Sequence, residues 1–281
     1  MHDAGFHSWE DAVRWLMRQP DKQQLVRECY YDVPRELAAK RYRESEEWQA
    51  IRKLLPRPPG RALDVGAGHG MTTMALAHDG WQVTALEPDG SSLVGTGAIQ
   101  KLARSASVRV RVVQGTAEAM PFADACFDLV FARQAMHHAA DLSRFCQQIH
   151  RVLKPGGAFV AVRDHVVSNA RQLSRFLKQH PLHALYGGEM AYPLSTYRHA
   201  LHSAGFQIAR VIRPLVSPVN AAPNTERVLL ERARTWLASY PFGRLPARML
   251  HPAMFHLMFR LAAHVDRRPG RLYSFVAIRP E

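Results

Sequence analysis

Short apolar runs alternate with helical stretches between residues 61 and 163, and this alternation is the feature that most restricts the fold. An uninterrupted apolar run is typical of a strand that is buried on both faces of a sheet. A helix between two such strands returns the chain across the sheet, so the strands run parallel. The sequence therefore predicts an α/β fold with a mostly parallel sheet. The predicted strands are 61–65, 82–86, 108–113, 127–132 and 157–163, and the predicted helices are 70–79, 91–104 and 141–153.

Further elements are predicted before and after this region, helices on the N-terminal side and strands on the C-terminal side. Residues 1–55 carry apolar side chains at helical spacing and are followed by the helix-breaking sequence PRPPG. The run at 107–113 alternates valine with arginine, which predicts a half-exposed strand at an edge of the sheet. Two more strands are predicted at 207–212 and 272–278, separated by more residues than a plain loop uses. The predicted organisation is an N-terminal helical segment at 1–55, a core at 56–212 with an insertion at 166–192, a helical cap insertion at 213–271 and a final strand at 272–281.

The composition narrows the class of partner. The chain of 281 residues has 37 Lys and Arg against 24 Asp and Glu, which gives a formal net charge of +13. Such a charge attracts polyanions at low salt, but the arginines are dispersed and lack interleaved aromatic side chains, so nucleic acid is not the expected partner. No apolar run approaches the roughly 18 residues of a membrane span. The N-terminus has no basic start followed by an apolar stretch, and we expect a cytoplasmic protein.

The cysteines give no support to a metal centre. Cys29, Cys126 and Cys146 are an odd number and form no CxxC pair. This usage favours reduced structural thiols over disulfides or zinc ligands. On this ground, no metal site is expected.

A glycine-rich turn is the strongest functional signal. The sequence LDVGAGHG at 63–70 follows a predicted strand and opens a predicted helix. Glycines at such a turn let a ligand approach the backbone without Cβ clashes. Glu87 ends the next predicted strand, 23 residues after Asp64, where a carboxylate can accept both hydroxyls of a ribose. The turn and the spaced acid together predict a nucleotide-like ligand, and the alternative for Glu87 is a plain surface charge.

Four further motifs follow this turn in order. They are LEPD at 86–89, GTAEAMPF at 115–122, FDLVFARQAMHH at 127–138 and RVLKPGGAFV at 151–160. In this order the chain resembles the class I S-adenosylmethionine-dependent methyltransferases, in particular the family typified by ubiquinone and menaquinone biosynthesis methyltransferases. The resemblance covers roughly residues 50–165 and 192–212. It implies S-adenosylmethionine as cofactor and a Rossmann-like sheet of seven strands, whose last strand is antiparallel and lies between the fifth and the sixth.

The resemblance also implies cofactor contacts, residue by residue. The glycine-rich turn would face the methionine part, Glu87 the ribose, and the loop at 116–118 the adenine. Family members more often carry Asp where Thr116 stands, so a backbone contact is expected there. Arg133 would reach the methionine carboxylate or remain solvated. The implied cofactor-binding residues are Asp64, Gly66, Gly68, His69, Glu87, Pro88, Thr116, Ala117, Glu118, Ala132 and Arg133.

Candidate bases lie beyond the fourth predicted strand. Transfer of a sulfonium methyl needs mainly a nucleophile held in line with the methyl carbon. A hydroxyl or acidic carbon must also lose a proton, and His137 and His138 are the best candidates to accept it. Asp164, His165 and Tyr192 are weaker candidates. The chain has 15 histidines, so a packing or hydrogen-bonding role is the alternative for each.

Other classes of protein fit less well. A nicotinamide dehydrogenase needs a third glycine where Met71 stands. An RNA-directed methyltransferase would suit the charge, but ARQAMHH lacks the Asn/Asp-Pro-Pro-aromatic motif. A non-catalytic protein that binds S-adenosylmethionine is the remaining alternative.

The expected acceptor is a small, partly apolar or lipid-linked molecule, methylated on oxygen or carbon. The segment 251–265 has a broad apolar face flanked by arginines, which either packs on the core or rests peripherally on an anionic membrane.

Overall fold

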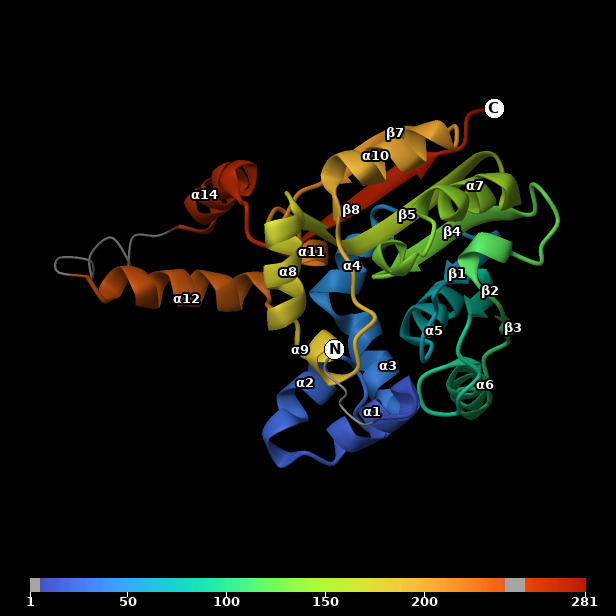
Figure 1. The fold of residues 1–281 in the computed structure, drawn as a ribbon, viewed down its shortest axis with the longest axis horizontal. Coiled ribbons are helices and arrows are strands. Elements are labelled where there is room, and N and C mark those ends of the chain that lie inside the picture. Colours follow the sequence, from blue (N-terminus) through green and yellow to red (C-terminus); the bar gives the residue numbers. More distant parts are fainter. Residues whose placement is uncertain (1–5, 241–250) are drawn as a thin grey trace.

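The computed structural model describes residues 6–240 and 251–281 and contains an eight-stranded sheet (Figure 1). Seven strands lie in the order β3-β2-β1-β4-β5-β8-β7, and β6 pairs with the end of β5. The first five strands are parallel, whereas β8 is antiparallel to both of its neighbours. The strands are β1 (Arg61–Val65), β2 (Gln82–Glu87), β3 (Arg111–Gln114), β4 (Phe127–Arg133), β5 (Leu153–Val167), β6 (Tyr192–Pro193), β7 (Gln207–Ile212) and β8 (Arg271–Ile278).

This topology confirms the predicted α/β fold, with the antiparallel last strand inserted beside β5. The extra strand, β6, consists of two residues that run beside Val166 and Val167. The predicted third strand is confirmed as an edge strand, but it begins at Arg111 instead of residue 108. Its start is later because Val108 N donates to Ala103 O at 3.0 Å, so the chain is still leaving the preceding helix there.

Helices cover both faces of the sheet. On one face α7 and α10 contribute apolar side chains such as Phe145 and Leu201 to the core. On the other face α3, α4, α5 and α6 contribute a second group that includes Tyr42, Trp48 and Met74. These helices are α3 (Arg35–Glu44), α4 (Glu46–Arg52), α5 (Met71–His78), α6 (Thr96–Ser105), α7 (Leu142–Val152) and α10 (Leu194–Ser203).

The N-terminal helices meet the 166–192 segment beyond the carboxyl ends of the strands. Val13, Leu16 and Val26 pack with Val94, which lies in the loop after β2, and with leucines of α9. The N-terminal segment is thus helical, as predicted, and lies at the edge of the sheet where a ligand would bind. The elements are α1 (Trp9–Met17), η1 (Pro20–Lys22), α2 (Gln23–Glu28), α8 (Ala170–Gln179) and α9 (Pro181–Leu185).

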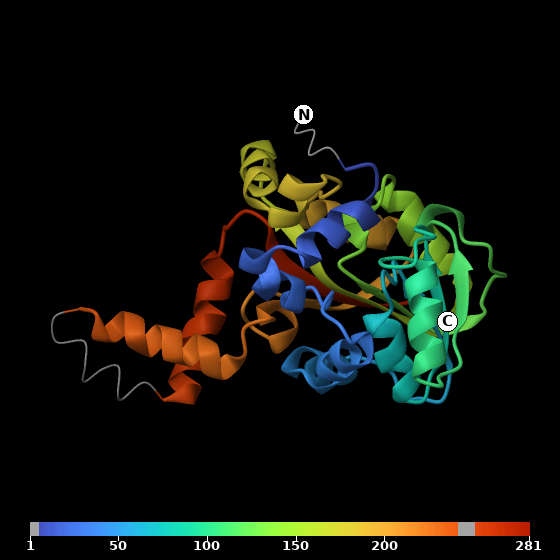
Figure 2. The same ribbon diagram turned by 90° about the horizontal axis from the view of Figure 1, so that it is seen from below.

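The long segment between β7 and β8 is helical in its described parts. The short helix α11 (Pro218–Ala221) packs against α4, β5 and β8. The helices α12 (Glu226–Ala238) and α14 (Pro252–Val265), which we call the arm, project from the core (Figures 1 and 2). Leu230 and Phe255 form a small core between them. The role of 213–271 as a cap stays a prediction, and its residues 241–250 lie outside the described part of the chain.

None of the described helices is both long enough and apolar enough to span a bilayer.

Candidate active site

The strand order puts the topological switch point of the sheet between β1 and β4. From β1 the chain moves outward through β2 to β3 and then crosses back to β4, so the connections after β1 and β4 leave in opposite directions. Ligands of open α/β sheets bind at this kind of switch point, beyond the carboxyl ends of the strands. Val65 at the end of β1 is level with Leu86 of β2 and with Ala132 of β4. The turn after β1, Glu87 and the loop after β4 therefore begin at one edge.

The glycine-rich turn after β1 has a backbone that only glycine adopts easily. Gly66, Gly68 and Gly70 have φ values of +65°, +53° and +93°. The turn is fastened to β2 because Gly66 N and Ala67 N both donate to Leu86 O. A Cβ atom at Gly66 would lie 2.9 Å from that of Ala135, whereas one at Gly68 would meet no atom within 4 Å. The backbone at Gly68 is thus open to a ligand.

Two buried acids flank this turn. Asp64 Oδ2 accepts hydrogen bonds from the hydroxyls of Thr72 and Thr73, both at 2.6 Å. Its Oδ1 is buried and has no hydrogen-bond partner among the described residues. Burial raises the pKa of Asp64 to about 6 in spite of the two hydroxyls. Glu87 accepts from Gly68 N at 2.8 Å and Asp89 N at 3.0 Å, and burial also raises its pKa.

The unpartnered oxygen of Asp64 and the open backbone at Gly68 fit S-adenosylmethionine. A buried carboxylate oxygen without a donor calls for a cationic or N–H group, which the methionine part of the cofactor carries. Glu87, the second buried acid, ends the adjacent strand β2. We call the glycine-rich turn, Asp64 and Glu87 the cofactor edge.

The predicted adenine-side residues lie on the loop after β3. Gly115 N donates to Glu87 O at 3.1 Å, which draws this loop to the end of β2. Ala117 and Glu118 belong to the short helix η2 (Ala117–Ala119), while Thr116, just before this helix, and Pro88, just after β2, are exposed. Glu118 Oε1 accepts from Ala140 N at 2.9 Å, so its carboxylate anchors the loop after β4.

His69 and Arg133 have partners that the sequence did not reveal. The His69 ring lies 4.6 Å from that of Tyr31 in the N-terminal segment, and burial lowers the pKa of His69 to about 3. Arg133 Nε and Nη2 pair with the two carboxylate oxygens of Glu47, at 2.7 and 3.2 Å. Contact with the methionine carboxylate and exposure to solvent were the two expectations for Arg133, and its guanidinium is held by Glu47 of α4. Ala132 is buried between Val65 and Ala161.

Glu47 is the centre of a buried charge cluster. Only 2% of its side chain is exposed, and Arg163 Nε lies 3.7 Å from its Oε1. Burial disfavours its ionisation, but the two arginines outweigh burial and lower the pKa of Glu47. Its surroundings in the sequence, EEWQAIR, resemble the exposed acidic first turn of any helix. The sequence therefore gave no signal for its burial.

The candidate bases gather beyond β4 and β5. His137, in the short helix η3 (Met136–His138), is buried, with Nδ1 at 2.9 Å from Asp164 Oδ1 and Nε2 at 3.4 Å from Glu189 Oε2. Burial opposes its charge, but the two carboxylates raise the pKa of His137 to about 9. His138 is exposed, and its Nδ1 lies 3.0 Å from Gly188 O.

Two of the weaker candidates join this group and one does not. The rings of His165 and His137 lie 4.8 Å apart, edge to face, and Asp164 is the partner of His137. Tyr192 instead donates its hydroxyl to Ala139 O at 2.9 Å. Glu189 was missed, because a lone acid after two glycines carries no pattern. The histidine cluster, as we call it, consists of His137, His138, Asp164, His165 and Glu189.

Comparisons with known proteins agree with this geometry. A family model described as a methyltransferase domain matches residues 63–161. The uncharacterized methyltransferase YcgJ of Bacillus subtilis is 33% identical over 43% of this chain and 47% of its own length. A ubiquinone biosynthesis O-methyltransferase of Azorhizobium caulinodans is 33% identical, over 39% of this chain and 42% of its own. A 24-methylenesterol C-methyltransferase of rice, Oryza sativa subsp. japonica, is 28% identical, over 78% of this chain and 62% of its own.

These alignments span less than two thirds of each relative, and for YcgJ about half. The crystal structure of YcgJ shares the fold, with a TM-score of 0.52, 22% identity and coverage of 82% of this chain and 96% of that one. The matched residues 63–161 include the cofactor edge and both candidate histidines after β4. S-adenosylmethionine is the cofactor of proteins with this domain. Residues 63–161 therefore form a methyltransferase domain, and the chain as a whole is similar to S-adenosylmethionine-dependent methyltransferases.

Proposed function

We propose that this protein transfers a methyl group from S-adenosylmethionine to a small, partly apolar or lipid-linked acceptor, on oxygen or carbon. The observation that carries the proposal is the cofactor edge. There, an open glycine backbone, a buried carboxylate oxygen without a donor and a second acid on the next strand lie at the carboxyl ends of β1 and β2. A scaffold protein would have no use for the buried, unpartnered oxygen of Asp64, whose desolvation costs free energy.

The residues of the cofactor edge would hold the donor in place. Gly66 and Gly68 would let the donor approach the backbone closely, Asp64 would accept from the methionine part and Glu87 from the ribose. When bound, S-adenosylmethionine supplies a sulfonium methyl that is already activated. The protein has mainly to place the acceptor in line with that methyl and to exclude water.

The exposed ring of His138 is our candidate for the residue that removes the acceptor proton. If its Nδ1 donates to Gly188 O at 3.0 Å, its Nε2 carries the lone pair. His137 lies directly behind it, with ring centroids 4.2 Å apart, and Asp164 fixes its orientation. Both histidines follow β4, which is adjacent to β1 and its glycine-rich turn. A proton acceptor at this point would lie beyond the carboxyl end of β4, next to the strand that carries the glycine-rich turn.

An apolar cover at the same edge supports a partly apolar acceptor. Trp9 of α1 packs against Tyr31 and Tyr186, with ring centroids 6.4 and 5.8 Å away. Leu182 and Leu185 of α9 contact the same group. These side chains come from the N-terminal helices and from the 166–192 insertion, so both segments would shape the acceptor site.

The arm offers a second apolar surface, and it supports peripheral contact of a cytoplasmic protein with a membrane. Its outer face carries large apolar side chains that are 47 to 74% exposed, together with basic residues. A lipid-linked acceptor would be reached most easily from such a position. The exposed side chains on α14 are Met254, Leu257, Met258, Leu261 and Val265.

The test is turnover with radiolabelled S-adenosylmethionine in fractionated cell extract, followed by identification of the product by mass. We expect label in a small-molecule or lipid fraction. Label that stays with RNA and disappears after ribonuclease treatment would favour the RNA-directed alternative. Binding of S-adenosylmethionine without turnover in any fraction would favour the non-catalytic alternative.

A further inference from the structure

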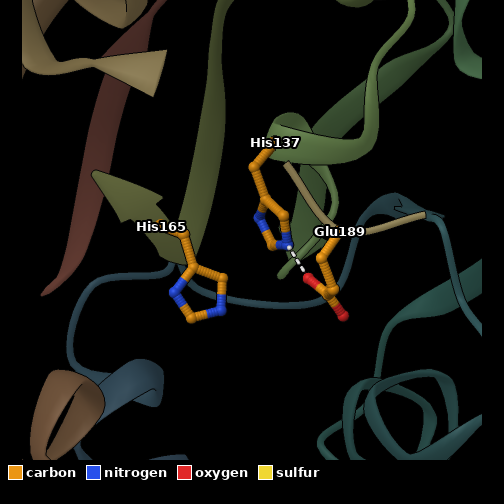
Figure 3. Close-up of side chains that lie close together, drawn as sticks. All are labelled: His137, His165 and Glu189. Atoms are coloured by element: carbon orange, nitrogen blue, oxygen red, sulfur yellow. Dashed lines mark ion pairs between the residues drawn. The ribbon is translucent and has the colours of Figure 1, made fainter. Parts of the chain in front are cut away.

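Three side chains of the histidine cluster point potential ligand atoms at one small space (Figure 3). They are His137 from the helix after β4, His165 from β5 and Glu189 from the loop before β6. One ligand atom from each lies within 4.8 Å of the other two. Among the residues that the structure describes, this is the one such group of three or more His, Cys, Asp or Glu side chains.

In both histidine rings, Nδ1 is the nitrogen that faces away from the other ligand atoms, and it lies within hydrogen-bond distance of an oxygen. His165 Nδ1 lies 2.8 Å from Gly270 O, and a carbonyl oxygen can only accept, so this nitrogen carries the proton. His137 Nδ1 lies 2.9 Å from Asp164 Oδ1, which places a carboxylate behind the ring. In the neutral rings the lone pairs therefore sit on the two Nε2 atoms. Histidines that bind metals are held in this way by a carboxylate or carbonyl behind them.

Among the described residues, His165 Nε2 has no partner, whereas His137 Nε2 and Glu189 Oε2 form an ion pair. His165 is only 7% exposed, and its Nε2 has no hydrogen bond within the described chain. Glu189 Oε2 is also buried without a hydrogen bond in the described chain, but it forms ion pairs with His137 Nε2 at 3.4 Å and His138 Nε2 at 3.8 Å. Buried polar atoms are rarely left in this state, since each costs free energy. A metal ion would displace the proton that His137 Nε2 shares with Glu189, and the two Nε2 atoms and the carboxylate oxygen lie close enough together to contact one ion.

We propose that His137, His165 and Glu189 bind a divalent transition-metal ion. Imidazole nitrogens with a carboxylate oxygen are a donor set that suits Zn²⁺ and Fe²⁺. Two ligands about 2.1 Å from a tetrahedral metal lie about 3.4 Å apart, and His137 Nε2 and Glu189 Oε2 have this separation. The His165 ring would approach by a small rotation. Three protein ligands leave a coordination position for water or an oxygen atom of a substrate.

This site escapes a search of the sequence for metal motifs. The expectation of no metal rested on the cysteines, whereas these ligands contain none. The two histidines are 28 residues apart, and Glu189 follows 24 residues later, so no short spacing links them. Only the parallel pairing of β4 with β5 and the return of the chain at β6 bring them together.

The experiment measures Zn²⁺ binding to the untagged full-length chain by calorimetry, and Co²⁺ binding by its visible absorption. We expect about one ion per chain, with the intense bands of a low-symmetry, four- or five-coordinate Co²⁺ site. Glu189→Gln keeps the shape of the side chain but removes its charge, and should weaken Zn²⁺ binding at least about tenfold. Asp164→Asn, which removes the charge behind His137, should weaken it by about ten- to a hundredfold.

His202→Ala is the matched control, because this histidine is exposed and lies on α10, away from the cluster. Its Zn²⁺ affinity should equal that of the wild type. Thermal melts of the metal-free proteins would show that Glu189→Gln still folds, since the residue lies in a loop. No stoichiometric ion in the wild-type protein, or equal affinity in the wild type and a folded Glu189→Gln variant, would overturn the proposal.

Discussion

The cofactor edge and the histidine cluster lie at the same end of the sheet but are assembled differently. The cofactor edge comes from turns directly after two adjacent strands, and the register of Val65 with Leu86 brings Gly66 and Glu87 to one level. The histidine cluster combines a helix after β4, the end of β5 and a loop that returns from α9. Adjacent strands make a site that spacing reveals, whereas a returning loop makes one that only the fold reveals.

The Glu47 cluster joins the N-terminal helices to the core beside both sites, and its loss should have the largest effect. Glu47→Ala would leave Arg133 and Arg163 without their buried partner. Breaking a buried pair costs about 3–5 kcal/mol. We expect the free energy of unfolding to fall by about 3 kcal/mol, the lower end of that range, because the Arg133 side chain is still 21% exposed to solvent. Urea unfolding measures the loss.

Glu44→Ala provides the comparison, since its surface pair with Lys40 is worth at most about 1 kcal/mol. The contribution of Glu47 should also depend on pH. Because its pKa is lowered in the folded protein, the contribution is present above the unfolded pKa, about 4.3. It is lost as pH falls through the folded pKa. Equal stability of the wild type and the Glu47 variant at neutral pH would remove the cluster as a stabilising link.

The histidine cluster should be separable from cofactor binding by mutation. We expect His138→Ala to lower turnover on the identified acceptor about a hundredfold, the low end for loss of a general base, and His137→Ala, which removes the ring behind it, to lower turnover as well. Affinity for S-adenosylmethionine should stay within about threefold. Steady-state kinetics and calorimetry on the same preparations measure both quantities, with His202→Ala as control. Normal turnover of both variants from about pH 6 to 9 would show that neither histidine is the base.

Mutation of the cofactor edge should instead weaken the binding of S-adenosylmethionine. Glu87→Ala is expected to weaken S-adenosylmethionine binding about tenfold to a hundredfold, because a hydrogen bond to a charged group contributes about 1.5–3 kcal/mol. The fold should survive, since the carboxylate contacts only two backbone N–H groups of nearby turns. Asp124→Ala, at an exposed ion pair with Arg151, is the charge-matched control. An unchanged dissociation constant in folded Glu87→Ala would place the ribose elsewhere.

The sequence predicted the sheet well because strand signals are local. The apolar runs at 61–65 and 207–212 coincide with β1 and β7, and the run at 272–278 is one residue shorter than β8. The third strand was placed early because an alternating run cannot show that Val108 is still bonded to the preceding helix. Periodicity reports which residues are apolar, but the backbone partners decide where a strand begins.

The site was only partly predictable, because local sequence signals do not reveal contacts between distant parts of the chain. Glycines with positive φ and an acid at a strand end follow from local backbone requirements. The partners of Arg133 and His137 do not, because Glu47 and Glu189 lie 86 and 52 residues away in the sequence. A buried acid and a solvated one look alike in a sequence. Burial of charge depends on tertiary packing, and packing places these carboxylates.

Mutation of the arm has the smallest expected effect, and it tests whether the exposed apolar face of α14 binds membranes. Phe255 is 3% exposed and packs on Leu230, so it belongs to the small core of the arm. Leu261 is 63% exposed and faces outward. Leu261→Ser should therefore weaken binding to anionic vesicles by about threefold, since an interfacial helix buries its apolar face only partly. Ala262→Ser, an exposed neighbour, should leave binding unchanged. Vesicle flotation at low and high salt measures both variants. Binding that resists salt and the loss of Leu261 would leave the arm without a membrane role, and its apolar face would then have to be covered by the acceptor or by another protein.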